Sequence, residues 1–367
     1  SAIFLMSENA SDNMDLTQST WMVRDLEQAV SDVLLLEDDS VIAGGWDGAI
    51  KYWSAEGDTV WSIETPNRIS CLTIESDKLY ATSGLHLLKI DLKTGHIDWQ
   101  IGLEGSADAV VVTKKCVIAS SSVYDIEHND FLESAIWSVS FEGEVLETHR
   151  MDERPWTLQL SELDVIAGLG RPKSGWIKLD GDGDIIEQKE GWTTPTICSS
   201  KTMPVLFGRA DGSVVTMDET VLHEMKESIT AISIRGNSLL AADDSGRVDL
   251  LISDKIVWSK TGDAVVGLEH GFPHNGDTTT WIARWNGAVG SVSVRNSTSG
   301  NEIASMDGER VHAISVNDKR VGVATEGGQI MIWEQALFDR RSNQETPAEQ
   351  VDEHRNSMLA KLRALRK

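Results

Sequence analysis

Three arginines stand at positions where they could bind an anion. Arg68, Arg154 and Arg310 each come immediately before a short strand in which apolar and polar residues alternate. A guanidinium group binds a carboxylate through two parallel hydrogen bonds. Three such groups at one position of a repeated unit therefore predict a site for an acidic peptide or another anion. The alternative is that each arginine pairs with an acidic neighbour.

Residues 180–184 alternate aspartate with glycine, a pattern that could bind calcium. Carboxylates alternating along a glycine-rich turn can converge on one hard cation. However, Ile185 stands where an EF-hand loop needs glycine, and Gly191 stands where it needs its bidentate glutamate. We therefore expect an acidic hairpin here, with no metal and no cofactor.

Two long segments, 124–134 and 171–174, lead into expected third strands, and 154–156 links two units. These three segments should lie on one face, where aromatic and arginine side chains commonly anchor a partner. Variable surface loops are the alternative. The candidate binding residues are Tyr124, Phe131, Arg154, Trp156, Arg171 and Lys173, together with Arg68 and Arg310.

Signals for catalysis and for secretion are weak. The sequence has no nucleophile elbow, phosphate loop, zinc-spaced histidine pair or cysteine–histidine signature, so we expect no enzyme activity. Cys71, Cys116 and Cys198 are scattered through apolar stretches, which is typical of free buried thiols in a reducing compartment. Residues 1–5 lack the features of a signal peptide, and no apolar run could span a membrane. A cytoplasmic protein is the expectation.

The charge of the chain limits its partners. The 367 residues include 58 acidic and 33 basic side chains, a formal charge of −25. Such a protein repels nucleic-acid backbones and anionic lipid, so we expect neither as a direct partner. It favours protein partners, either basic or peptide-like, although solubility alone also explains the charge.

A repeated unit determines the expected fold. A strand that closes on a small residue recurs eight times, at steps of 34 to 48 residues: 41–44, 79–82, 117–120, 165–168, 206–208, 239–242, 281–283 and 321–324. This spacing matches four short strands per unit. Pairs such as Asp47-Gly48 and Asn286-Gly287 follow the repeated strand. They predict primed turns, in which both central residues have positive φ.

Two stretches resemble known repeats. Residues 44–53 resemble the core of a tryptophan–aspartate (WD) repeat, and 325–333 is a looser copy. Residues 91–99 resemble the quinoprotein repeat, in which Thr94-Gly95 leads into a docking tryptophan, Trp99. The resemblance covers residues 20–335 and implies an all-β propeller. It implies a non-enzymatic interaction scaffold, with a PQQ-type quinoprotein oxidoreductase as the alternative.

The leftover strands predict how the ring closes. Residues 309–334 supply three strands, and residues 20–26 can supply the fourth from the N-terminus. We expect eight blades, or seven if 155–188 is an insertion. The predicted layout is a disordered segment over 1–18, the propeller over 19–336, a linker over 337–346 and an amphipathic helix over 347–367.

The C-terminal segment predicts a docking helix. Thr346, Pro347 and Glu349 form the pattern of a capping box. The apolar positions Val351, Met358, Leu362 and Leu365 then follow a 3-4 spacing that is typical of a short coiled coil. We expect this helix to engage a partner or to self-associate weakly. The alternative is that it folds back on the acidic propeller.

Overall fold

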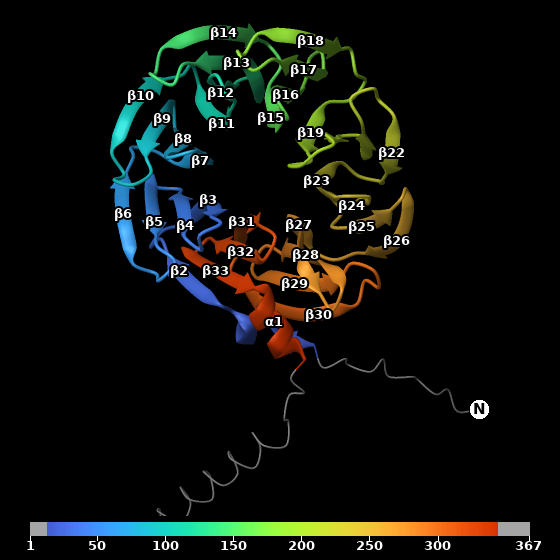
Figure 1. Ribbon diagram of the computed structural model, residues 1–367. Helices are drawn as coiled ribbons and strands as arrows, with labels where there is room; N and C mark the ends of the chain where they lie inside the picture. Colours follow the sequence, from blue (N-terminus) through green and yellow to red (C-terminus); the bar gives the residue numbers. More distant parts are fainter. Residues whose placement is uncertain (1–12, 344–367) are drawn as a thin grey trace, which may run out of the picture.

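Each of the eight segments that end in small residues forms the second strand of its own sheet. The computed structural model describes residues 13–343 and arranges these sheets as a ring of eight antiparallel blades (Figure 1). The first strand of each blade lies innermost and the fourth lies at the perimeter. The prediction of an eight-bladed β-propeller is confirmed, and the unit at 155–188 is a regular blade.

The blades are numbered here in chain order. Blade 1 contains β3 (Val30–Leu35), β4 (Val41–Gly45), β5 (Ala49–Trp53) and β6 (Thr59–Glu64); blade 2 contains β7 (Ile69–Glu75), β8 (Lys78–Ser83), β9 (His86–Asp91) and β10 (Ile97–Gly102). Blade 3 contains β11 (Ser106–Val112), β12 (Val117–Asp125), β13 (Asp130–Val139) and β14 (Val145–Met151); blade 4 contains β15 (Pro155–Ser161), β16 (Asp164–Leu169), β17 (Gly175–Leu179) and β18 (Ile185–Glu190). Blade 5 contains β19 (Thr196–Ser199), β20 (Phe207–Arg209), β21 (Ser213–Val215) and β22 (Val221–Glu224); blade 6 contains β23 (Ile229–Arg235), β24 (Ser238–Asp243), β25 (Val248–Ile252) and β26 (Lys255–Lys260). Blade 7 contains β27 (Ala264–His274), β28 (Asp277–Trp285), β29 (Gly290–Asn296) and β30 (Glu302–Gly308), with β1 (Met14–Asp15) as a fifth strand; blade 8 contains β31 (Val311–Val316), β32 (Arg320–Thr325), β33 (Gln329–Glu334) and β2 (Met22–Asp25).

The small residues of the second strands are required by close packing between blades. A Cβ atom on Gly44 would lie 2.6 Å from Ile69 of the next blade, and one on Gly208 would lie 2.5 Å from Ile229. Both distances are well inside van der Waals contact, so only glycine fits without displacement of the neighbouring blade.

Tryptophans fill the wider gap toward the perimeter. The indole of Trp61 on β6 lies against Gly95 in the turn of the next blade, and its Nε1–H donates to the Leu92 carbonyl at 2.8 Å. Trp99 and Trp258 repeat this contact on Gly143 and Gly300. The docking tryptophan implied by the quinoprotein resemblance is therefore present in at least three blades.

The turns after the second strands differ from the sequence prediction. Gly48 and Gly212 have φ values of 99° and 88°, but the aspartates that precede them do not have positive φ. The Gly48 N–H instead closes a turn onto the Gly45 carbonyl, with an N···O distance of 3.4 Å. The chain therefore makes a wider turn in which glycine alone takes the left-handed conformation, and the predicted primed turns are wrong.

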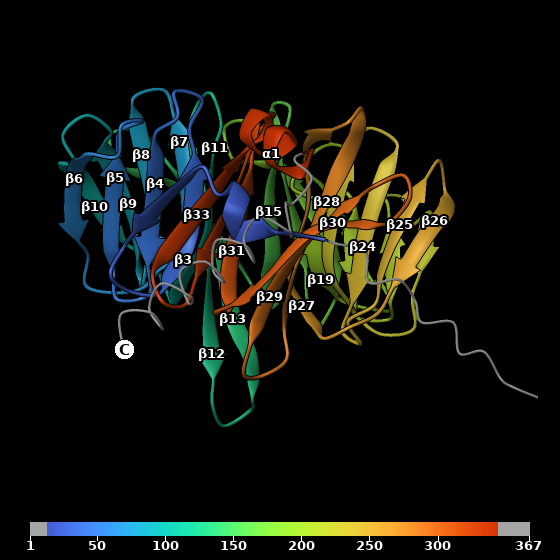
Figure 2. The same ribbon diagram turned by 90° about the horizontal axis from the view of Figure 1, so that it is seen from below.

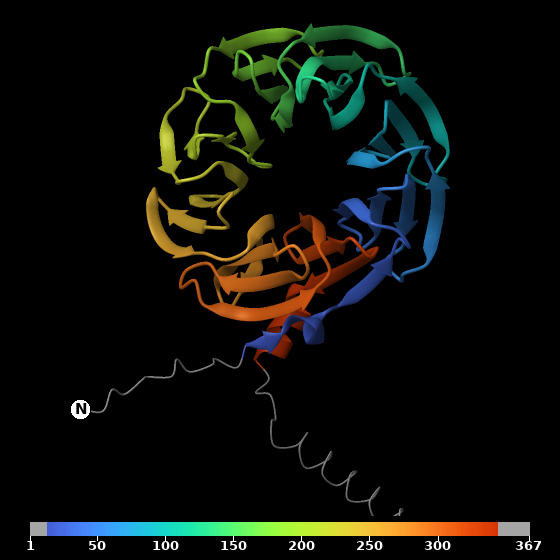
Figure 3. The same cartoon turned by 180° about the vertical axis from the view of Figure 1, so that it is seen from behind.

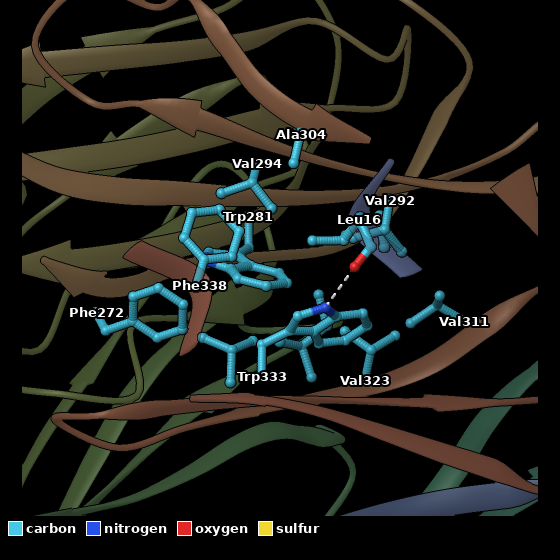
Figure 4. Close-up of a cluster of buried hydrophobic side chains, with 13 residues drawn as sticks. Leu16, Phe272, Trp281, Val292, Val294, Ala304, Val311, Val323, Trp333 and Phe338 are labelled. Atoms are coloured by element: carbon cyan, nitrogen blue, oxygen red, sulfur yellow. Dashed lines mark hydrogen bonds between the residues drawn. The ribbon is translucent and has the colours of Figure 1, made fainter. Parts of the chain in front are cut away.

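The N-terminus closes the ring as predicted. Strand β2 pairs antiparallel with β33, with Met22 opposite Ile332. Strand β1 then pairs with β30 of blade 7, and the 3₁₀ helix η1 (Leu16–Ser19) connects β1 to β2. The indole of Trp333 donates to the Leu16 carbonyl at 2.9 Å inside a cluster of buried apolar side chains (Figure 4).

Both ends of the described chain are more ordered than the sequence predicts. The segment expected to be disordered up to residue 18 contains β1 and most of η1, because Leu16 is fully buried between blades 7 and 8. The stretch expected to be a linker after residue 336 forms helix α1 (Gln335–Ser342), which Glu334 caps by accepting from the Leu337 N–H. Phe338 of α1 is fully buried against Phe272 and Trp281.

The ring has two distinct faces. Helix α1 lies on one of them, which we call the helix face (Figure 2). The turns between first and second strands and between third and fourth strands lie on the same face. The turn at 125–130 between β12 and β13 projects from the other, which we call the arm face (Figures 2 and 3). The links between blades also lie on the arm face. The predicted helix over 347–367, with Val351, Met358, Leu362 and Leu365, lies outside the described residues.

Candidate binding site

The arm at 125–130 is a shaped hairpin. The Asp125 carboxylate accepts hydrogen bonds from the backbone N–H groups of Glu127 and His128, at 2.7 and 3.2 Å. The Tyr124 hydroxyl donates to the Asn129 side chain, which bridges the two sides of the turn. These bonds fix the direction in which Tyr124 and Phe131 leave the two strands.

Arg154 joins the arm to the next blade. Its guanidinium group lies 3.9 Å from the centre of the Phe131 ring and 4.1 Å from that of Trp156. The Phe131 ring in turn contacts Tyr124 and Trp156 edge-on, with centroids 5.1 and 5.8 Å apart. A cation against two aromatic faces is favourable, so these four side chains form one unit that we call the arm cluster.

Arg154 is also paired with a carboxylate. Its Nη2 lies 3.2 Å from Asp108 Oδ1, and the Ser122 hydroxyl donates to the other carboxylate oxygen. Burial raises the pKa of Asp108, while Ser122 and Arg154 act to lower it. For this arginine, the predicted alternative of an acidic neighbour is present.

A cavity of about 710 Å³ opens beside the arm cluster. Tyr124, Phe131, Arg154 and Trp156 line it, together with Arg68 of blade 2. The other lining residues include three serines, two glycines and one carboxylate, at Ser70, Ser106, Ser122, Gly84, Gly105 and Asp108. The structure thus brings five of the eight predicted binding residues to one cavity, which we call the arm-face cavity.

The remaining three predicted residues lie elsewhere. Arg171 pairs with Asp130 of the arm at 3.5 Å, and Lys173 pairs with Glu190 at 3.3 Å. Both side chains are exposed and neither lines the arm-face cavity. Arg310 lies at the start of blade 8, where its guanidinium group is 5.8 Å from the Trp285 ring.

Arg68 and Arg310 share a contact that sequence reasoning missed. The Arg68 guanidinium lies 3.7 Å over the ring of Trp46, in the turn of the preceding blade, just as Arg310 lies over Trp285 of its preceding blade. Within residues 13–343, no carboxylate oxygen lies within ion-pair distance of either arginine, so the predicted acidic partner is missing for both. The available signal was a tryptophan at the end of the second strand of the preceding blade, Trp46 before Arg68 and Trp285 before Arg310; Trp46 is exposed and Trp285 is partly buried.

Charged groups on the helix face are largely paired with one another. Lys201 pairs with Glu269 at 2.7 Å, and the Glu269 carboxylate also accepts from Ser233. The segment at 180–184 is the hairpin turn between β17 and β18, and Asp180 accepts from the N–H groups of Asp182 and Asp184. These bonds are those of an acidic hairpin. Across residues 13–343, no three His, Cys, Asp or Glu side chains are grouped to hold a metal ion.

Cys71, Cys116 and Cys198 are free, and burial raises the pKa of Cys71 and of Cys198 to about 12. These thiols are therefore weak nucleophiles at neutral pH. In the described part of the chain, no helix has the length and apolar composition needed to cross a membrane.

Comparison with known proteins supports the fold. No family model and no curated protein matches the sequence. By structure, the chain is similar to the computationally designed protein Ika8, with a TM-score of 0.68, 17% identity and coverage of 85% of this chain and 98% of that one. It is similar to BamB from Moraxella catarrhalis (TM-score 0.67, 14% identity, 86% and 99% coverage) and to Sqt1 from Saccharomyces cerevisiae (0.68, 13%, 86% and 98%). At these identities the likeness shows the fold alone: the chain is an eight-bladed β-propeller.

Proposed function

We propose that the chain is a non-enzymatic binding propeller that takes a peptide segment of a protein partner in its arm-face cavity. The observation that supports this most strongly is the arm cluster, in which Arg154 lies between two aromatic rings at the cavity wall. Tryptophan, tyrosine and arginine are enriched among the few side chains that dominate the energetics of protein interfaces.

The dimensions and chemistry of the cavity suit a short peptide segment. Its volume of about 710 Å³ lies within the ordinary range for ligand sites. Trp156 and Tyr124 are 42% and 47% exposed, so both rings can still bury apolar surface when a partner arrives. The Ser70 and Ser106 hydroxyl groups and the backbone at Gly84 and Gly105 can hydrogen-bond to a main chain.

The proposed setting is a reducing, cytoplasmic one. Three free thiols in a chain without a disulfide among its described residues fit such a compartment. The predicted helix at 347–367 remains a second proposed point of attachment, for a partner or for another copy of the chain.

Peptide selection tests the proposed function. A library of random dodecapeptides displayed on phage would be selected on the full chain and depleted on a Tyr124→Ala/Trp156→Ala variant. Both side chains are exposed, so this variant should remain folded and lose no more than about 6 °C in melting temperature. We expect enriched peptides that bind the full chain and lose at least about tenfold in affinity on the variant, as is usual when interface anchors are truncated.

A matched control removes similar apolar surface from another place. Ile256 and Val257 on β26 are 50% and 41% exposed at the perimeter of the ring. An Ile256→Ala/Val257→Ala variant should bind the selected peptides like the unchanged chain. Peptides that bind the arm variant unchanged, or that depend on β26, would show that the proposed site is wrong.

A further inference from the structure

A second group of side chains lies on the arm face, toward the inner edge of blades 8, 1 and 2. The Trp46 ring is its centre: the Arg68 guanidinium is 3.7 Å away and the His312 ring is 5.3 Å away. His312 lies on β31, two residues after Arg310. Three successive blades therefore contribute to one group, which we call the Trp46 cluster and which consists of Trp46, Arg68, Arg310 and His312.

The arginines of this cluster have unused donors. Within residues 13–343, neither Arg68 nor Arg310 donates a side-chain hydrogen bond to protein or forms an ion pair. Eight other arginines each pair with a carboxylate, at positions 150, 154, 171, 209, 235, 247, 295 and 320. Acidic residues outnumber basic ones by 58 to 33. Two unpaired arginines on one face of such a protein therefore require a specific explanation.

Stacking prepares the Arg68 guanidinium group for an anion. This group lies 3.7 Å over the Trp46 ring, which restricts its orientation and leaves its N–H edges free, whereas Arg310 is 5.8 Å from the Trp285 ring and is held less closely. The N–H edges of a guanidinium match the two oxygens of a carboxylate. Partial burial removes part of the hydration of Arg68 and lowers its pKa. An incoming carboxylate would therefore meet a cation that is already partly dehydrated and correctly oriented.

Two arginines and one glutamate act on His312. Burial lowers the pKa of His312 first and Arg310 lowers it next; Glu326 acts in the opposite direction, and Arg68 has a smaller lowering effect. Charges beyond the Debye length of about 8 Å are largely screened at physiological salt. The net charge of −25 therefore acts mainly on the rate at which a charged ligand approaches the protein. At contact distance, the adjacent arginines determine which ligand binds.

We propose that Arg68 and Arg310, with His312 beside them, form a carboxylate-binding subsite for an acidic stretch of the peptide that occupies the arm face. This inference rests on the proposed function and adds the chemistry of the partner. Arg68 also lines the arm-face cavity, so a peptide anchored by the arm cluster can continue directly onto the Trp46 cluster. The subsite selects glutamate or aspartate at that end of the peptide.

Calorimetric titration of the full chain with an acetylated, amidated hexaglutamate peptide tests this inference. We expect measurable binding at pH 7 and 50 mM NaCl that weakens at 300 mM NaCl. An Arg68→Gln/Arg310→Gln variant should bind at least tenfold more weakly, because both carboxylate donors are lost. If that variant fails to fold, Arg68→Lys/Arg310→Lys replaces it; the loss should then be several-fold, since charge remains but bidentate pairing does not.

The control variant removes the same two charges from the helix face. Lys115 lies in the turn between β11 and β12, and Lys255 begins β26 directly after the turn from β25, so both lie at the helix face. A Lys115→Gln/Lys255→Gln variant should change hexaglutamate affinity less than threefold. No binding by the full chain, or an equal loss in both double variants, would overturn the inference. The proposed function is judged separately: if selected peptides still depend on Tyr124 and Trp156 but hexaglutamate does not bind, only the acidic subsite fails.

Discussion

Two arginines on opposite faces of the ring have different partners. On the helix face, Arg320 is 5% exposed, lies 2.7 Å from the Asp39 carboxylate and donates to the Leu36 carbonyl at 2.9 Å. On the arm face, Arg68 stacks on Trp46 without a carboxylate partner in the described residues. The first arginine stabilises the contact between blades 8 and 1. The second is available to a ligand, unlike Arg154 of the same face, which pairs with Asp108.

The largest expected effect comes from the closure of the ring on the helix face. Phe338 is fully buried against Phe272 and Trp281, so Phe338→Ala leaves a cavity where α1 meets blade 7. We expect the free energy of unfolding to fall by about 3–5 kcal/mol, measured by urea denaturation. Peptide binding at the arm face should be unchanged under conditions where the variant remains folded.

The control for this prediction is an aromatic residue of the arm face. Trp156 is 42% exposed, so Trp156→Ala should cost less than about 1.5 kcal/mol of stability while it removes peptide binding. If Phe338→Ala and Trp156→Ala lose similar amounts of stability, the aromatic residue of the arm face supports the fold as much as that of the helix face does, and the contrast between the two residues is wrong.

On the helix face, a smaller loss of folding stability is expected when the pH falls. His270 is 4% exposed and its Nε2 lies 3.3 Å from the Ser238 carbonyl. Burial lowers its pKa to about 4, whereas an unfolded histidine titrates near 6.5. The unfolded chain therefore binds a proton that the folded chain does not, and stability is lost as pH falls from 6.5 toward 4. The expected loss is about 3 kcal/mol.

The variant His270→Gln isolates this effect. Asp32 acts in the opposite direction, because burial raises its pKa to about 6 and the folded chain then takes up a proton as pH falls. The comparison must therefore be between variant and unchanged chain, by urea denaturation at pH 7 and at pH 4.5. We expect the variant to lose less stability on acidification. An identical pH dependence would show that His270 is not held neutral by the fold.

The sequence was sufficient to predict the ring because its signals are local and repeated. A strand that ends in small residues is recognisable wherever blades must approach closely, as at Gly44 against Ile69. The closing strand β2 could be predicted because blade 8 lacked a fourth strand. Helix α1 could not, since its stability comes from Phe338 packing on residues of blade 7 that are distant in the sequence.

The candidate site was predicted only in part, because some of its contacts join residues that are distant in the sequence. Arg154, Phe131 and Trp156 lie in segments that the blade topology places on one face, so their proximity follows from the fold. The contact between Trp46 and His312 joins blades 1 and 8, which are at opposite ends of the chain. Neither periodicity nor spacing shows which side chain faces which across that junction.

The most direct test of the comparison makes the same substitution on each face. Methionine is unbranched like the arginine stem, though shorter than arginine, and its thioether can contact an aromatic ring, but it carries no charge and no N–H donor. Arg320→Met removes the ion pair with Asp39 and leaves the partly buried Leu36 carbonyl without its Arg320 donor. We expect the free energy of unfolding to fall by about 2 kcal/mol.

The smallest expected effect is that of Arg68→Met. This substitution breaks no ion pair within the described residues, and the thioether can still pack on Trp46, which is 40% exposed. The free energy of unfolding should therefore change by less than about 0.5 kcal/mol, as for most surface substitutions. Hexaglutamate affinity should nevertheless fall severalfold, since one of the two donors is gone, whereas Arg320→Met should leave that affinity unchanged. A stability loss at Arg68 equal to that at Arg320 would mean that Arg68 supports the ring. The argument that its unpaired guanidinium is held for a ligand would then fail.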